Sequence, residues 1–166
     1  MLMGKLLARA ALSEGRHVTW MPSYGAEVRG GTAHSMTKVS DNYIASPVVL
    51  TPSVCVVMNY PSLLKYEDKV RSGGLLIVNR SLMNRMPKRR DITILNIAMT
   101  DIASKLGNIK VANMVGLGAL VGAEKTVSKN NALDALAEMM KGKEDLLALN
   151  KKAFDKGYKL GRRRRW

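Results

Sequence analysis

The stretch SYGAEVRGG, residues 23–31, sets an acidic and a basic side chain among glycines, and the rest of the chain is organised around it. The preceding residues 17–21, HVTWM, are largely apolar and predict a strand, so the stretch is expected to be a loop at the end of that strand. Arg29 can offer a planar fork of donors to a carboxylate or a phosphate, and Glu27 can orient that fork or accept from a ligand. The glycines let a ligand or another chain approach the backbone closely. A tight turn with a surface ion pair is the alternative interpretation.

Five stretches follow one another along the chain: YGAEVRGGTAH (24–34), VVMNYPSLLKY (56–66), GGLLIVN (73–79), IASKLGNIKVANMVGLGAL (102–120) and LNKKAFDKGY (149–158). In this order they resemble the gamma subunit, or gamma domain, of 2-oxoacid:ferredoxin oxidoreductases. The resemblance covers nearly the whole chain and is therefore specific. It implies a Rossmann-like accessory domain beside the active site of a larger enzyme, with a role in assembly and in the access of coenzyme A.

The resemblance also implies the chemistry of the complex. Enzymes of this family oxidatively decarboxylate a 2-oxoacid on thiamine diphosphate, pass electrons through iron–sulfur clusters to ferredoxin, and form an acyl-CoA. The residues of the motifs resemble those of members acting on 2-oxoglutarate or on 2-oxoacids in general more than those of members acting on pyruvate. Thiamine diphosphate and clusters are expected in other subunits, which are the expected partners together with ferredoxin. The residues carried over as the matching loop, which contacts either coenzyme A or a neighbouring subunit, are Tyr24, Gly25, Glu27, Arg29, Gly30 and Gly31.

Family members similar to this chain begin with a strand and a glycine-rich turn ahead of their first helix. Here an amphipathic helix is expected at residues 2–14 already, so that strand and turn are missing. A truncated start is favoured over a real loss of the strand, and the helix should border a gap in the sheet. The sequence thus predicts one N-terminally truncated gamma-type domain at residues 1–161 and a basic tail at residues 162–166.

Strands and helices alternate along the remaining sequence. The expected strands are residues 54–58, 75–78 and 92–99, with a weaker candidate at 32–40, and the expected helices are residues 63–69, 102–106, 112–121 and 144–158. This alternation predicts an α/β fold with three layers, a Rossmann-like arrangement in which a mostly parallel sheet has helices on both faces.

In such sheets, ligands bind beyond the carboxyl ends of the strands. Polar or flexible groups follow three expected strands, at residues 23–31, Asn59 and Asn79. The sequence therefore predicts a binding edge that includes both asparagines. Local capping of helices or turns is the alternative role for these side chains.

The charge is unusual for a chain of 166 residues, with 27 lysines and arginines against 13 acidic residues and a net charge of +14. Such a balance favours acidic or polyanionic partners. A basic nucleic-acid-binding protein is the main alternative function, but aromatic residues make up only 5% and no reading motif is present. An isolated nucleotide-binding domain is a third possible function, and the missing glycine-rich turn argues against it. The tail arginines are expected to be solvated and to dock on an acidic surface of a partner subunit or of ferredoxin.

The sequence contains no complete set of catalytic groups. No nucleophile elbow, Walker A sequence or metal-binding histidine pair occurs, so neither catalytic residues nor a metal site are expected in this chain. Cys55 is the single cysteine, which excludes an internal disulfide and an iron–sulfur cluster, and its apolar neighbours predict a buried position. No apolar run is long enough to span a bilayer, and Lys5 and Arg9 interrupt the first apolar residues, so a cytoplasmic protein without a membrane partner is expected.

Overall fold

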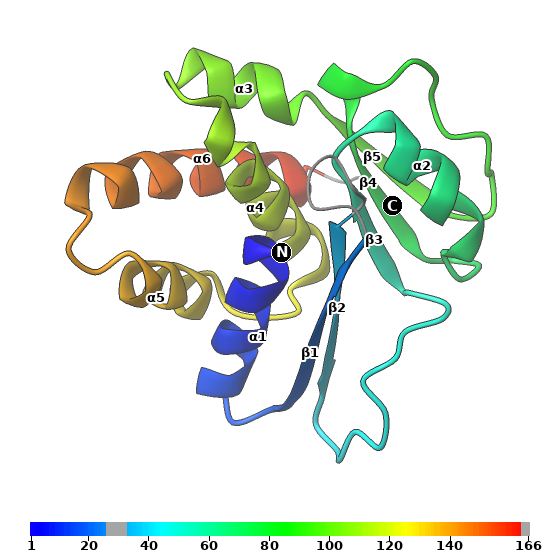
Figure 1. The fold of residues 1–166 in the computed structure, drawn as a ribbon, viewed down its shortest axis with the longest axis horizontal. Helices are drawn as coiled ribbons and strands as arrows, with labels where there is room; N and C mark the ends of the chain where they lie inside the picture. The colour runs from blue at the N-terminus through cyan, green and yellow to red at the C-terminus, as the bar shows by residue number, and fades with distance from the viewer. Residues whose placement is uncertain (26–32, 164–166) are drawn as a thin grey trace.

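The strands of the protein form two separate sheets. In the computed structural model, which describes residues 1–25 and 33–163, β1 (His17–Tyr24) pairs with β2 (Ala33–Ser40) in an antiparallel hairpin. A parallel sheet has the order β3 (Val54–Val57), β4 (Leu75–Asn79), β5 (Thr93–Ile97). The α/β class and the parallel strands are confirmed, and the weak strand candidate is β2 (Figure 1).

The first predicted strand differs from expectation in its partner. Expected in the main sheet, it pairs instead with the next strand of the chain. Residues 25–32 connect the two strands, and so short a connection suits an antiparallel hairpin, because a parallel crossover needs a dozen residues or more. Tyr24, the last residue of β1, therefore ends a strand of the hairpin and not a strand of the parallel sheet.

The parallel sheet carries helices on both faces. All five residues of β4 are buried, and their alternation divides the core in two. Leu75 and Ile77 pack in the larger cluster with α1 (Leu2–Ser13), α4 (Ala112–Glu124), α5 (Lys129–Met139) and α6 (Glu144–Arg162). Leu76 and Val78 pack in the smaller cluster, under α2 (Tyr60–Tyr66) and η1 (Glu67–Lys69). The remaining elements are η2 (Arg80–Leu82), α3 (Met99–Lys105) and η3 (Ile109–Val111).

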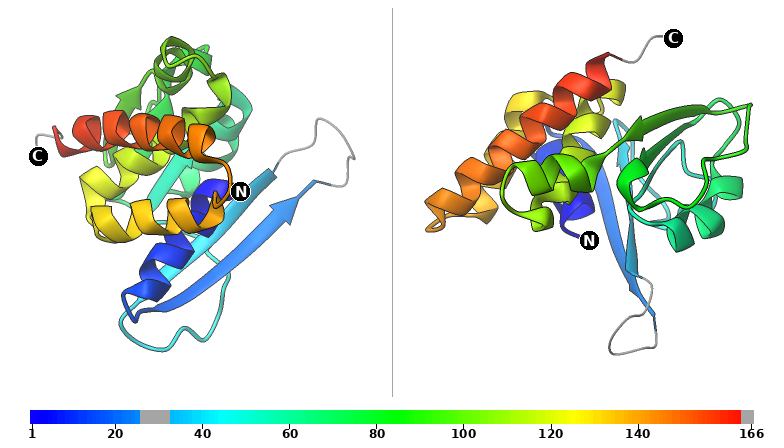
Figure 2. Two further views of the ribbon diagram at one scale, coloured as in Figure 1. Left: turned by 90° about the vertical axis from the view of Figure 1, so that its left-hand side faces the viewer. Right: turned by 90° about the horizontal axis from the view of Figure 1, so that it is seen from above.

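Helices α4 and α6 cross at very close range, with α6 along the outer side of α4 (Figure 2). A Cβ atom added to Gly118 would overlap the carbonyl oxygen of Phe154, and one added to Gly157 would overlap that of Val115. Gly118 and Gly157 therefore have a packing role, because a larger residue at either position would push the two helices apart. Gly161 belongs to the same contact, where it lies against the Ala119 backbone of α4. Helix α6 continues through Gly161 and ends at Arg162, so it includes the first residue of the expected tail.

A groove of about 440 Å³ separates the hairpin from the parallel sheet. Among its lining residues are Met3 and Leu7 of α1, Ser35 and Thr37 of β2, and Val54 and Val56 of β3. Each of these two strands has one partner among the described residues, so each presents a free edge. The groove borders α1 between these two edges, and the additional strand that the resemblance implies stays a prediction.

Candidate functional site

The end of the hairpin lies beside α2. Tyr24 pairs with Ala33 at the last position of the ladder and is 70% exposed, and Gly25 is exposed as well. The other residues of the predicted loop, Glu27, Arg29, Gly30 and Gly31, lie outside the described residues, so their role stays a prediction. The hairpin places Tyr24 at its end, in an accessible position next to the second layer of helices.

A cluster of cations surrounds one aromatic ring where the hairpin meets α2. The ring centroids of His34 and Tyr66 are 5.4 Å apart, and the ammonium groups of Lys65 and Lys69 each lie 5.5 Å from the Tyr66 centroid. Burial lowers the pKa of His34, and the positive charges of Lys65 and Lys69 lower it further. Sequence reasoning missed this cluster, because residues 34 and 66 belong to different elements and no local pattern connects them.

Asn59 lies two residues beyond the end of β3, which stops one residue before the predicted end of that strand, and it caps a helix. Its side-chain oxygen accepts a hydrogen bond of 3.0 Å from the backbone N–H of Ser62, in the first turn of α2. An asparagine in this position satisfies one of the donors that a helix leaves unpaired at its start. The side chain is exposed, so its use in ligand binding stays a prediction beside the capping role.

Asn79 is fully buried at the end of β4 and makes three hydrogen bonds. Its amide nitrogen donates to the Met58 carbonyl oxygen at 3.0 Å and to the Thr100 hydroxyl at 2.9 Å. Its oxygen accepts from the Thr100 backbone N–H at 3.2 Å. These bonds join the ends of β3 and β4 to the first turn of α3. The three partner atoms belong to residues 21 positions away in the sequence, and Asn79 makes no side-chain capping bond to η2, so its polar atoms are used in tertiary packing and not in the local capping that the sequence offered as the alternative.

Replacing Asn59 with alanine is expected to lower the free energy of unfolding by about 1 kcal/mol, because the first turn of α2 loses its cap. Asn59→Ser retains an oxygen that can accept from the same N–H, so this variant should stay within a few tenths of a kcal/mol of the wild type. Urea unfolding of the three proteins measures both effects. Equal stability of the alanine variant and the wild type would contradict the capping role.

A buried carboxylate holds the basic loop that follows η2. Glu67 is 4% exposed, and its two oxygens accept from the Arg85 guanidinium at 3.1 Å and from the backbone N–H groups of Lys88 and Arg89. The Arg89 guanidinium in turn donates to the carbonyl oxygens of Glu67 and Val70. This basic loop, residues 83–92, is thus fixed on η1. An isolated glutamate at the end of a short helix gave no signal of this role in the sequence.

Cys55 is partly buried, whereas the sequence predicted a buried position. It lies in β3 opposite Leu76 and packs against the smaller core cluster. Burial raises the pKa of the thiol to about 11. A raised pKa disfavours the thiolate, which is the reactive form.

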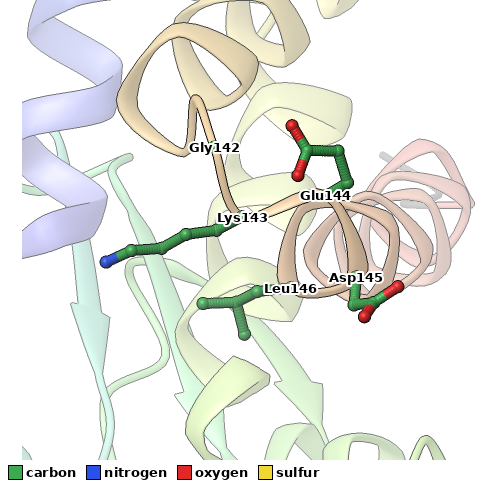
Figure 3. A pocket seen from close by; sticks show the side chains of 5 residues that line it. All are labelled: Gly142, Lys143, Glu144, Asp145 and Leu146. Atoms are coloured by element: carbon green, nitrogen blue, oxygen red, sulfur yellow. The ribbon is translucent and has the colours of Figure 1, made fainter.

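The turn between α5 and α6 encloses a shallow hollow of about 600 Å³. Figure 3 shows that its charged side chains diverge, with Lys143 directed away from Glu144 and Asp145. Groups that point apart cannot enclose one ligand. Across residues 1–25 and 33–163, no three histidine, cysteine or acidic side chains are grouped to hold a metal ion.

No helix in the part of the chain that the structure describes is both long and apolar enough to cross a membrane.

Comparison with known proteins connects this architecture to a family. A family model described as "Pyruvate ferredoxin/flavodoxin oxidoreductase" matches residues 1–160. The chain is 36% identical to 2-oxoglutarate synthase subunit KorC of Methanocaldococcus jannaschii, over 97% of its own length and 87% of KorC. It is 33% identical to ketoisovalerate oxidoreductase subunit VorA of Methanothermobacter marburgensis, over 93% of its own length, and it spans only about a third of VorA (32%). Its fold is similar to the keto/oxoacid ferredoxin oxidoreductase gamma subunit from Geobacter sulfurreducens, with a TM-score of 0.81 and 27% identity over 96% of this chain and 89% of that one.

Proposed function

Because the chain belongs to the pyruvate ferredoxin/flavodoxin oxidoreductase family, we propose that it is the gamma subunit of a 2-oxoacid:ferredoxin oxidoreductase. In this role it supports assembly of the complex and the access of coenzyme A during oxidative decarboxylation, and ferredoxin accepts the electrons. The observation that carries the proposal is the match to KorC over most of both chains. The same match supports 2-oxoglutarate as the substrate, with the branched 2-oxoacid of the VorA relative as the second candidate. The nucleic-acid alternative finds no support among these relatives.

The donor groups of this chain fit one of the expected cofactors and not another. Iron–sulfur clusters are held by sets of cysteine thiolates, whereas this chain has one cysteine, Cys55, with a protonated thiol. The clusters therefore belong to other subunits in this proposal, as does thiamine diphosphate. Coenzyme A carries phosphate groups, and an arginine between glycines, as at Arg29, suits phosphate recognition.

Purification of the tagged chain from its natural source tests the proposal. It should be recovered with chains that carry thiamine diphosphate and iron–sulfur clusters. The recovered complex should reduce ferredoxin and form an acyl-CoA, fastest with 2-oxoglutarate. Recovery of the chain alone, or with nucleic acid, would contradict the assignment. Faster turnover of a branched 2-oxoacid would change the substrate and leave the subunit role in place.

Arg29→Lys is expected to lower acyl-CoA formation by about one to two decades, because lysine keeps the charge and loses the bidentate fork, and a charged hydrogen bond is worth roughly 1.5–3 kcal/mol. Turnover and subunit association are measured on the same preparations. A higher KM for coenzyme A with intact assembly places the loop at the substrate. Weaker assembly with normal turnover per complex makes it an interface element. If neither quantity changes, the loop has no part in the function.

A further inference from the structure

Among the described residues, Lys65 and Lys69 beside Tyr66 have no acidic partner, whereas some other cations do. Arg9 pairs with Glu138 at 3.2 Å and Lys129 with Asp155 at 2.7 Å. Within the described residues, no carboxylate lies at ion-pair distance from Lys65, from Lys69 or from His34. Two ammonium groups therefore share one ring, and their repulsion is unrelieved in this part of the chain.

The two acidic residues nearest in sequence both bind the loop of residues 83–92. Glu67 binds Arg85 and the backbone of this loop. The backbone carbonyl oxygen of Asp68 accepts a hydrogen bond of 3.4 Å from the Arg89 guanidinium. Among the described residues, neither acid forms an ion pair with Lys65 or Lys69.

The surface around the cluster is accessible and positively charged. Lys65 and Lys69 are exposed. Lys88 and Arg90, also exposed, extend the positive charge from the loop that Glu67 holds against η1. Exposed charges of one sign suit recognition of a partner surface of the opposite sign.

The Tyr66 ring also argues against nucleic acid as the occupant. Two ammonium groups lie over it, and the His34 ring tilts against it at 50°. Single-stranded nucleic acids bind to basic surfaces largely by stacking bases on free aromatic faces. Here the ring is already in contact with protein groups and is not free for a base.

We propose that the face formed by His34, Lys65, Tyr66 and Lys69 docks on an acidic surface of another chain of the oxidoreductase. This inference rests on the proposed function, since it needs a complex in which the chain is a subunit. Carboxylates of the partner would replace solvent around the unpaired cations and remove their mutual repulsion. Charge complementarity of this kind orients an encounter and discriminates against wrong partners.

The test reverses the charge of the face and compares it with a matched reversal elsewhere. K65E/K69E and the control K151E/K152E change the net charge equally, and the control lysines are exposed on α6. Dissociation of each chain from the purified complex is measured by native mass spectrometry and size exclusion at low and high salt. At low salt, K65E/K69E should weaken association at least tenfold, whereas the control should stay within twofold of the wild type. At 1 M salt the three proteins should converge, because exposed charges are then screened beyond about 3 Å.

Each outcome separates this inference from the proposed function. Equal weakening by both pairs would show a general effect of net charge and overturn the docking face. No weakening by K65E/K69E in a complex that still forms would overturn it as well, with the subunit role intact. If K65E/K69E loses retention on DNA while its association with the complex is unchanged, the face binds nucleic acid and not an acidic protein, and the proposal is overturned. Failure of the wild-type chain to associate at all would contradict the proposed function itself. Thermal unfolding of the isolated variants, expected to match the wild type, confirms that they fold.

Discussion

Gly118→Ala is expected to destabilise the protein by roughly 3 kcal/mol or more, which would place this variant among the most damaging single substitutions. A Cβ atom at this position would overlap the Phe154 carbonyl oxygen and would lie 2.8 Å from the backbone nitrogen of Tyr158. Backbone atoms cannot rotate away as a side chain can, so α4 and α6 must separate. The separation would open the larger core cluster, in which Phe154 is completely buried. Chemical unfolding measures the loss.

Gly116→Ala is the matched control in the same helix. Its added Cβ would meet the sulfur of Met99 at 3.2 Å and that of Met3 at 3.5 Å, both on flexible side chains. Alanine also favours a helix over glycine by about 1 kcal/mol. The control should therefore be neutral or slightly stabilising. Similar losses in the two variants would mean that α4 does not approach α6 as closely as the structure has it.

Glu67→Gln is expected to lower the free energy of unfolding by roughly 2–3 kcal/mol at pH 7, because hydrogen bonds to a charged group are the stronger kind and the loop loses its anchor. In glutamine, an NH2 group replaces one carboxylate oxygen. Arg85, Lys88 and Arg89 all donate hydrogen bonds at this place, so this NH2 group would face donors and no acceptor. Glu138→Gln is the control, since Glu138 is 71% exposed and pairs with Arg9 at the surface. A surface pair contributes about 0–1 kcal/mol.

The effect of this substitution should depend on pH. Burial raises the pKa of Glu67, but the N–H donors of Lys88 and Arg89 together with Arg85 lower it by more, so the pKa in the folded protein lies below the ordinary value of 4.5. A carboxyl group with a depressed pKa stabilises the protein above its unfolded pKa, and this contribution disappears as pH falls through the folded one. The difference between wild type and Glu67→Gln should therefore shrink below pH 4.5. A difference that stayed constant down to pH 2 would show that Glu67 does not titrate in this way.

Hydrophobic pattern predicted those parts of the fold that depend on one segment at a time. The continuous apolar run at residues 75–78 indicated a strand covered on both faces, and β4 is buried throughout. Helical spacing likewise located α1 and α6. Periodicity carries no information on which strand pairs with which. Residues 17–21 were therefore recognised as a strand but assigned to the wrong sheet, because the partner is chosen by the length of the connection to β2.

The candidate site was predicted in part for the same reason. Asn59 and Asn79 were found because each directly follows an apolar strand, but sequence alone did not decide between binding and local hydrogen bonding. Burial and the position of Thr100 commit the Asn79 side chain to three internal bonds. The contact of His34 with Tyr66 and the anchoring of the basic loop by Glu67 arise from tertiary packing. No spacing rule within one element could have predicted either of them.

The position of Cys55 makes its thiol a natural probe of local opening in this protein. The thiol is the only one in the chain, and it packs against the core cluster beneath α2 while its strand borders the groove. Because Cys55 is only partly exposed, reaction of its sulfur with a thiol reagent should speed up when β3 leaves β4 or α2 lifts from the sheet. An increase in the labelling rate therefore reports local opening of this half of the molecule, without any engineered cysteine. Because opening free energies differ between regions of a protein, comparison with the free energy of global unfolding shows whether the strand beside the groove opens on its own.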